Sequence, residues 1–172
     1  DVCCRLYGSL LSSLLDLLEE NDNIRGIELN GRSVSDTGAS LLGEFLRCNS
    51  SLKRLAIVNS SGRFKGVPVA IGIATNTSLT SLKFQHVRIG REGVNAIAQT
   101  LKENYTLEEL YLLYNSMESE SIRQLSEGLR ENKALSKLAL SGNDVSNQQF
   151  FLALHGNRTL TSLDLESCYL EN

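Results

Sequence analysis

The sequence predicts an α/β solenoid, a chain that coils through repeated turns so that each turn adds one strand and one helix. Three observations support this fold class. An apolar pattern recurs six times in 172 residues, its spacing stays close to 28 residues, and each copy changes from the period of a strand to that of a helix. Because the pattern spans nearly the whole chain, we expect one domain over residues 1–172.

The first element, over residues 1–22, is predicted to be a helix that caps the first turn. Residues 8–21 read GSLLSSLLDLLEEN, and Ser12, Ser13 and Asp16 interrupt the apolar run. The run is also shorter than the roughly 20 residues of a membrane span, so it predicts an amphipathic helix. The chain starts at Asp1 without a Met or a basic segment, so we expect a cut or processed start and no visible signal peptide.

Six short parallel strands are predicted, one in each copy of the pattern. The copies read IRGIEL, LKRLAI, LTSLKF, LEELYL, LSKLAL and LTSLDL, and they begin at Ile24, Leu52, Leu79, Leu107, Leu135 and Leu160. Each copy has apolar residues at its first, fourth and sixth positions. The alternation of the fourth and sixth positions is typical of a strand that is buried on one face.

Between the strands, the apolar residues follow a helical period. In GVNAIAQTLKEN, the residues Val94, Ile97, Ala98 and Leu101 recur at i, i+3, i+4 and i+7, which form one face of an α-helix. GASLLGEFLRCN and SIRQLSEGLREN follow the same pattern. Ser33, Ser35 and Asp36 are candidate caps of the first of these helices, and Pro68 fits near the start of the next one.

An asparagine follows the last apolar residue of every predicted helix by three positions. These helix-stop residues are Asn21, Asn49, Asn76, Asn104, Asn132 and Asn157. Since asparagine tolerates the left-handed backbone conformation that ends many helices, we expect that conformation at all six positions.

The unit LxxLxLxxNxL followed by a helix, at about 28 residues, resembles the leucine-rich repeat of the ribonuclease inhibitor-like subclass, which also occurs in NOD-like receptors. The resemblance covers residues 16–170, and residues 23–172 hold about five full repeats and a truncated sixth. It implies a right-handed horseshoe whose strands line the concave side and whose helices line the convex side.

The resemblance also implies a ladder of polar side chains at the ninth repeat position, where the family carries Asn or Cys. Asn115, Asn143 and Cys168 match that position, whereas the first three repeats carry Arg32, Ser60 and Val87. In these three repeats the backbone groups of the loop after the strand should therefore find other hydrogen-bond partners. We expect irregularity and mobility in residues 59–66. The last repeat stops after its strand, so either the natural protein continues or something else covers the final turn.

Strand positions that face away from the helices supply the candidate binding surface. These are repeat positions three, five and seven, and the eighth position follows at the rim. The candidate patch consists of Val58, Lys83, His86, Tyr111, Leu113 and Tyr114. Tyrosine offers a large contact area with a polar group at its end, which is why it is enriched at interface anchors. We expect this patch to bind a protein partner of unknown identity, although exposed apolar residues also occur on monomers without partners.

Nothing in the sequence points to catalysis or to a cofactor. His86 and His155 do not form a metal-binding spacing, and Asp164 and Glu166 lack an accompanying nucleophile or phosphate-binding loop. We therefore expect a protein that is not an enzyme and holds no metal. The net charge of −3 gives no reason to expect nucleic acid or an anionic membrane as a partner.

Localisation depends on the cysteines and on the acceptor sites for N-glycosylation. Cys3, Cys4, Cys48 and Cys168 form no CxxC pair, which favours free thiols and a cytoplasmic protein over a disulfide framework. Five sites match the acceptor pattern, at Asn49, Asn59, Asn76, Asn104 and Asn157, but four of these asparagines are the helix-stop residues. A glycosylated extracellular domain and a structural spacer in a larger receptor-like protein remain alternatives. We expect a monomer, or contacts through the uncapped C-terminal end.

Overall fold

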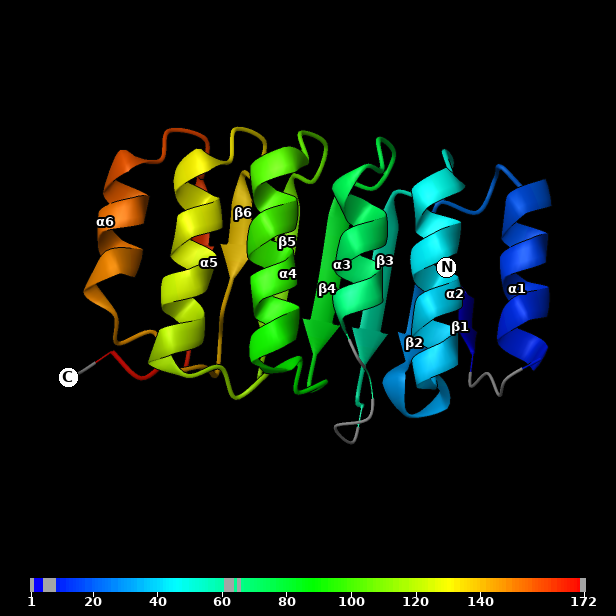
Figure 1. Cartoon of the computed structure of the whole chain (residues 1–172), viewed down its shortest axis with the longest axis horizontal. Coiled ribbons are helices and arrows are strands. Elements are labelled where there is room, and N and C mark those ends of the chain that lie inside the picture. Colours follow the sequence, from blue (N-terminus) through cyan, green and yellow to red (C-terminus); the bar gives the residue numbers. More distant parts are fainter. Residues whose placement is uncertain (1, 5–8, 61–63, 65, 171–172) are drawn as a thin grey trace.

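A computed structural model describes residues 2–4, 9–60, 64 and 66–170 of the chain. Strands and helices alternate, and all the described strands form one parallel sheet in which the order follows the sequence (Figure 1). The strands are β1 (Val2–Cys4), β2 (Gly26–Asn30), β3 (Arg54–Val58), β4 (Ser81–Gln85), β5 (Glu109–Leu113), β6 (Lys137–Ala139) and β7 (Ser162–Asp164). The helices are α1 (Ser9–Glu20), α2 (Asp36–Cys48), α3 (Gly66–Ala74), α4 (Gly90–Glu103), α5 (Ser119–Glu131) and α6 (Gln148–Gly156), with a 3₁₀ turn at Gly31–Ser33.

The predicted α/β solenoid is confirmed, and the six expected strands are β2 to β7. Strand β1 was not expected, because residues 1–22 were predicted to form only a helical cap. It runs parallel to β2, with Val2 opposite Ile27, and so adds an edge strand before the first repeat. Three residues are too few to display an alternation that sequence reasoning could detect.

Register between the strands places equivalent repeat positions side by side. Leu55 of β3 lies opposite Leu82 of β4, which lies opposite Leu110 of β5. All three are at most 1% exposed. Since burial of one leucine side chain contributes roughly 1.5–3 kcal/mol, these rows of core leucines are the main stabilising feature of the stack.

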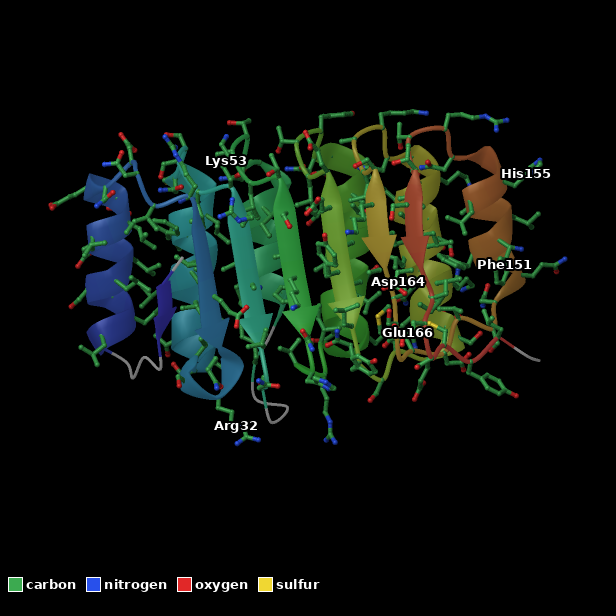
Figure 2. All side chains as sticks on the ribbon, turned by 180° about the vertical axis from the view of Figure 1, so that it is seen from behind. Arg32, Lys53, Phe151, His155, Asp164 and Glu166 are labelled. Atoms are coloured by element: carbon green, nitrogen blue, oxygen red, sulfur yellow. The ribbon has the colours of Figure 1, made fainter. Side chains whose placement is uncertain are left out.

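All the repeat helices lie on one side of the sheet, and no helix of the described residues lies on the other side (Figures 1 and 2). We call this other side the strand face. Close approach of neighbouring helices depends on small residues. A Cβ atom added to Gly72 of α3 would lie 2.2 Å from the carbonyl oxygen of Gly43 in α2, so only glycine fits there.

The loops from helix to strand are built on the helix-stop asparagines, but the left-handed backbone expected at these residues is wrong. Asn49, Asn104, Asn132 and Asn157 are extended, with φ between −66° and −88°. Their side chains end the helices in another way, by bonding to backbone groups.

Asn104 illustrates the pattern that the other repeats follow. Its Oδ1 accepts hydrogen bonds from the backbone N–H groups of Thr106 (3.0 Å) and Leu107 (2.8 Å), which shapes its own loop. Its Nδ2 donates to the carbonyl oxygens of Ile73 (2.8 Å) and Asn76 (2.9 Å) in the preceding turn. These bonds join each turn to the one before it.

A second set of side chains joins the turns where the strands end. Asn115 Nδ2 donates to the carbonyl oxygen of Phe84 (3.0 Å), and Asn143 Nδ2 donates to that of Leu112 (2.7 Å). The thiol of Cys168 donates to the carbonyl oxygen of Leu140 at 3.2 Å.

In the first two repeats, other residues make the hydrogen bonds of the loop after the strand. The 3₁₀ turn contains Arg32, whose backbone N–H donates to the side chain of Asn30. Ser60 Oγ accepts a hydrogen bond from the backbone N–H of Phe64 at 2.9 Å. The loop predicted to be mobile, residues 59–66, lies partly outside the described residues, which omit 61–63 and 65.

The last turn leaves its core positions open to solvent. Leu163, Tyr169 and Leu170 are 40%, 58% and 52% exposed, whereas Leu135 and Leu138, one turn earlier, are fully buried. No further turn covers them among the described residues. An apolar surface at this end of the stack is the result.

Candidate functional site

The predicted binding residues lie on the strand face or at its rim, but they do not form one continuous patch. Lys83 of β4 lies beside Tyr111 of β5, and Gln85 lies beside Leu113. Val58 of β3 lies on the far side of Gln85, so the polar column of β4 separates it from Leu113. The apolar centre of the surface is therefore β5.

Tyr111 and Leu113 are both half-buried, because neighbouring side chains shield them from the sides. The Tyr111 hydroxyl donates a hydrogen bond to Glu109 Oε2 at 3.1 Å, and Lys137 Nζ lies 5.2 Å from the centre of the ring. Hydrogen bonding and charge interaction with Tyr111 raise the pKa of the Lys137 ammonium, and the carboxylates of Glu109 and Asp164 raise it further. Tyr111 is thus held in place by charged neighbours.

Asp164 ends this network on the last strand. Its Oδ1 accepts a hydrogen bond from the backbone N–H of Glu166 at 2.9 Å. That bond, the Ser141 hydroxyl and the nearby Lys137 lower the pKa of the carboxyl group. A lowered pKa keeps this carboxyl group ionised down to a lower pH than usual.

At the rim, His86 and Tyr114 form a stacked pair with ring centres 4.8 Å apart and an interplanar angle of 13°. Both residues have a left-handed backbone, with φ of 54° and 52°. The Tyr114 ring also lies over Gly142, where an added Cβ atom would come within 2.1 Å of it. The sequence placed all three residues at the eighth repeat position, but it gave no sign that the rings would stack.

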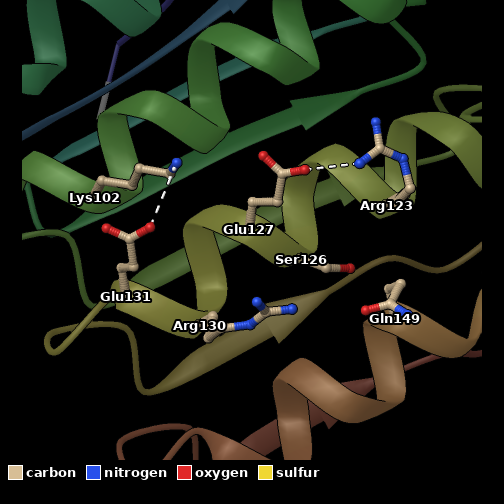
Figure 3. Close-up of a pocket in the computed structure, with 7 residues that line it drawn as sticks. All are labelled: Lys102, Arg123, Ser126, Glu127, Arg130, Glu131 and Gln149. Carbon is tan, nitrogen blue, oxygen red and sulfur yellow. Dashed lines mark hydrogen bonds and ion pairs between the residues drawn. The ribbon is translucent and has the colours of Figure 1, made fainter.

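A polar groove of about 590 Å³ lies on the helix side of the sheet (Figure 3). The sequence did not predict this groove. Lys102 pairs with Glu131 at 3.5 Å, and Arg123 pairs with Glu127 at 2.7 Å. Arg130 and Gln149 also line it. Exposed pairs of this kind contribute roughly 0–1 kcal/mol each, and their opposite signs give the groove no clear preference for a charged ligand.

We also searched the described residues for a possible metal site. No group of three or more His, Cys, Asp or Glu side chains there could hold a metal ion. His155 is exposed at the end of α6 (Figure 2), whereas His86 directly follows β4. Within the same residues, every helix is too short or too polar to cross a bilayer.

Comparison with known proteins supports the repeat assignment. The model of a family described as "Leucine Rich repeat" matches residues 75–98 and 156–172. The chain is 26% identical over 102 residues to human "NACHT, LRR and PYD domains-containing protein 5", which covers 58% of this chain and 8% of that protein. It is 34% identical over 102 residues to "Leucine-rich repeat-containing protein 45" of Gallus gallus, which covers 58% of this chain and 15% of that protein. The matched region is therefore a small part of either relative.

Two solved structures share the fold. The structure titled "Leiomodin-1 Actin-Binding Site 2 (ABS2)" aligns with a TM-score of 0.65 at 18% identity, over 86% of this chain and 87% of its own. The tropomodulin C-terminal domain of Caenorhabditis elegans aligns with a TM-score of 0.58 at 15% identity, over 85% of this chain and 92% of its own. At these identities the likeness concerns the fold alone.

Proposed function

We infer that this chain, which is a leucine-rich repeat protein, serves as a non-catalytic interaction module that binds a protein partner on its strand face. Domains of this family are generally protein-interaction modules. The observation that carries the proposal is the cluster of Tyr111, Leu113 and Tyr114 on β5 and its rim, which lies on the side of the sheet that no helix covers. Tyrosine is among the residues that are enriched at the anchor positions of protein interfaces.

Physical chemistry favours this surface over the rest of the strand face. Tyr111 already has its hydroxyl bonded to Glu109, so binding would immobilise little additional side-chain freedom. The charged side chains of Lys83, Glu109 and Lys137 surround the apolar centre, as polar rims do at interfaces. A scaffold, a sensor or an inhibitor would use such a surface in the same way.

The test is an affinity purification from native cells with the double variant Tyr111→Ser and Leu113→Ser. We expect loss of the partner, since truncating interface anchors costs about 2 kcal/mol or more each. The matched control is Leu41→Ser with Ile71→Ser, which removes two exposed apolar side chains from the helix side. Retention of the partner by the β5 variant would favour a structural spacer instead.

The leiomodin structure suggests one partner to include in the same experiment. Its title names an actin-binding site, and its fold resembles this chain over 86% of the residues. Co-sedimentation with filamentous actin would examine that candidate directly. Absence of sedimentation would remove actin and leave the strand face proposal intact.

A cytoplasmic location is proposed over the glycosylated extracellular alternative. Asn76 and Asn104 are 3% exposed, and both donate their amide hydrogens to carbonyl oxygens of the preceding turn. A sugar on either amide nitrogen would displace one of these bonds and would not fit in the buried loop. Among the described cysteines, Cys48 and Cys168 are free thiols. Glycans found on Asn76 of the native protein would overturn this location.

A further inference from the structure

The charged residues of the strands, and of the loops that follow them at the rim of the strand face, are sorted by sign along the stack. In each repeat we consider the described residues of the strand and of the start of the next loop, which are 26–34, 54–60 and 81–89 in the first half and 109–117, 137–145 and 162–170 in the second. The first half carries four cations and one anion, which are Arg32, Arg54, Lys83, Arg88 and Glu28. The second half carries one cation and four anions, which are Lys137, Glu109, Asp144, Asp164 and Glu166.

This sorting by sign follows the long axis of the molecule. Arg32 lies at the lower edge, in the turn that follows β2, whereas Asp164 and Glu166 lie near the β7 end (Figure 2). The centres of the two halves, β3 and β6, are three strands apart, or about 14 Å at the usual strand spacing. Because this exceeds the screening length of about 8 Å at physiological salt, each half attracts opposite charge independently.

The inner strands of the face, as far as they are described, offer a partner their side chains. Neighbouring strands pair in register from β2 to β7, so the backbone hydrogen bonds of the inner strands are already made. An extended peptide would need a sheet edge to pair with, whereas an α-helix satisfies its own backbone. A helix that lies across β2 to β7 would span about 24 Å, which is roughly 16 residues.

We propose that the strand face binds an amphipathic helix of a partner protein, with acidic residues over β2 to β4, apolar residues against Tyr111 and Leu113, and basic residues beyond them toward β7. This inference rests on the proposed function, because it specifies the chemistry of the partner at the same surface. Both charge and apolar contact contribute, because the apolar anchors on β5 lie between the basic half and the carboxylates Asp164 and Glu166 at the β7 end.

A second copy of this chain fits less well, although a bipolar face is complementary to itself. If two strand faces met with their strand orders reversed, β5 of one copy would lie over β4 of the other. Tyr111 and Leu113 would then face Lys83 and Gln85 of the second copy. That arrangement sets the apolar anchors against polar side chains, whereas a helix can present apolar residues to them.

The first experiment uses two synthetic helical peptides of equal composition. One carries a glutamate block, a central leucine face and an arginine block, and the other carries the same glutamates and arginines interleaved. Fluorescence anisotropy should give a dissociation constant about tenfold lower for the segregated peptide at low salt, and the difference should shrink in high salt. Equal affinity for the two peptides would overturn the inference.

The second experiment exchanges charges on the protein. The basic-half variant is Arg54→Glu with Lys83→Glu, the acidic-half variant is Asp164→Lys with Glu166→Lys, and a fourfold variant combines them. Either half variant should lose about tenfold or more in affinity, because one block of the peptide then meets like charge. The fourfold variant should recover binding, since the peptide can lie in the opposite direction. No recovery would contradict the inference.

Two controls keep the outcome interpretable. Arg130→Glu with Lys133→Glu makes the same change of net charge as the basic-half variant, but on α5 and the loop after it, so affinity should stay unchanged. Thermal melts report whether each variant is folded, and Asp164→Asn with Glu166→Gln replaces the acidic-half variant if that one unfolds. A dimer of the wild-type protein in sedimentation, dispersed by either half variant, would replace the helix with a second copy.

The two proposals fail in different ways. If the native partner is lost on Tyr111→Ser with Leu113→Ser but is retained by both half variants, the strand face is a binding surface and its charge polarity plays no part. If the native partner is retained by all of these variants, the proposed function fails together with the inference.

Discussion

Gly142 is the residue on which the aromatic pair at the rim depends. Its φ of +73° is a conformation that residues with a Cβ atom rarely adopt, and the Tyr114 ring occupies the space where that Cβ atom would lie. Tyr114 in turn stacks on His86. A small residue in the fifth repeat therefore positions rings of the third and fourth repeats.

We expect Gly142→Ala to displace Tyr114 and to destabilise the protein by about 1–3 kcal/mol, from backbone strain and the lost stacking. Urea unfolding measures the stability, and the proton chemical shifts of the His86 ring report the stacking. Gly156→Ala is the control, because its new methyl group would meet no atom within 4 Å. Unchanged His86 shifts in the Gly142 variant would contradict the expectation.

Sequence reasoning identified the asparagines but not their conformation. Both a left-handed backbone and side-chain bonding are common uses of asparagine at a helix end, and the choice depends on where the neighbouring turn places its carbonyl groups. That placement is a property of the stack. The same limit applies to Val58, whose distance from Leu113 follows from two strand pairings and not from its own repeat.

At the scale of elements, the helix-to-strand loops connect neighbouring turns through buried amide side chains. Asn76, Asn104 and Asn132 each bond to the turn before them and are at most 3% exposed. The elements that the sequence predicted well are those whose apolar period lasts long enough to be recognised, namely β2 to β7 and their helices. Strand β1 was missed because its pairing with β2, and not an internal pattern, defines it.

Asn104→Ala should therefore destabilise the fold strongly. It leaves the buried N–H group of Leu107 without its acceptor, at about 1–3 kcal/mol for an unsatisfied group, and it removes the bond to the carbonyl oxygen of Ile73, which keeps the N–H of Asn76 as a donor. Urea unfolding gives the change in the free energy of unfolding. Asn95→Ala, on the exposed side of α4, should change it by less than about 0.5 kcal/mol. Equal effects at the two positions would show that the helix-stop asparagines do not stabilise the fold.

At the scale of the whole molecule, stability should vary along the stack, because each turn is covered only by its neighbours. The middle turns are covered on both sides and their leucines are buried, whereas Leu163 of the last strand is 40% exposed. The fold class and the overall order of elements were predictable because the repeat itself encodes them. The charge polarity of the strand face could not be predicted from any single repeat, because it depends on the order in which the six repeats lie side by side.

Native-state hydrogen exchange should reveal this gradient. We expect amide groups of β7 to exchange faster than those of β5, since local opening of an end turn disrupts one interface instead of two. Equivalent positions, such as Leu163 and Leu110, allow a direct comparison. Uniform protection from β5 to β7 would mean that the stack unfolds as a single cooperative unit.

The regular spacing of the helix-stop asparagines affects how such a chain can change its length. Asn132 donates to the carbonyl oxygen of Asn104 in the same manner as Asn104 donates to that of Asn76. Deleting the 28 residues 77–104 would bring Asn132 to the same spacing from Asn76, so its amide would meet an equivalent acceptor. Duplication or loss of a gene segment that encodes one turn would thus preserve the hydrogen bonds between turns. The length of the stack could change in evolution while the loop sequences stay the same.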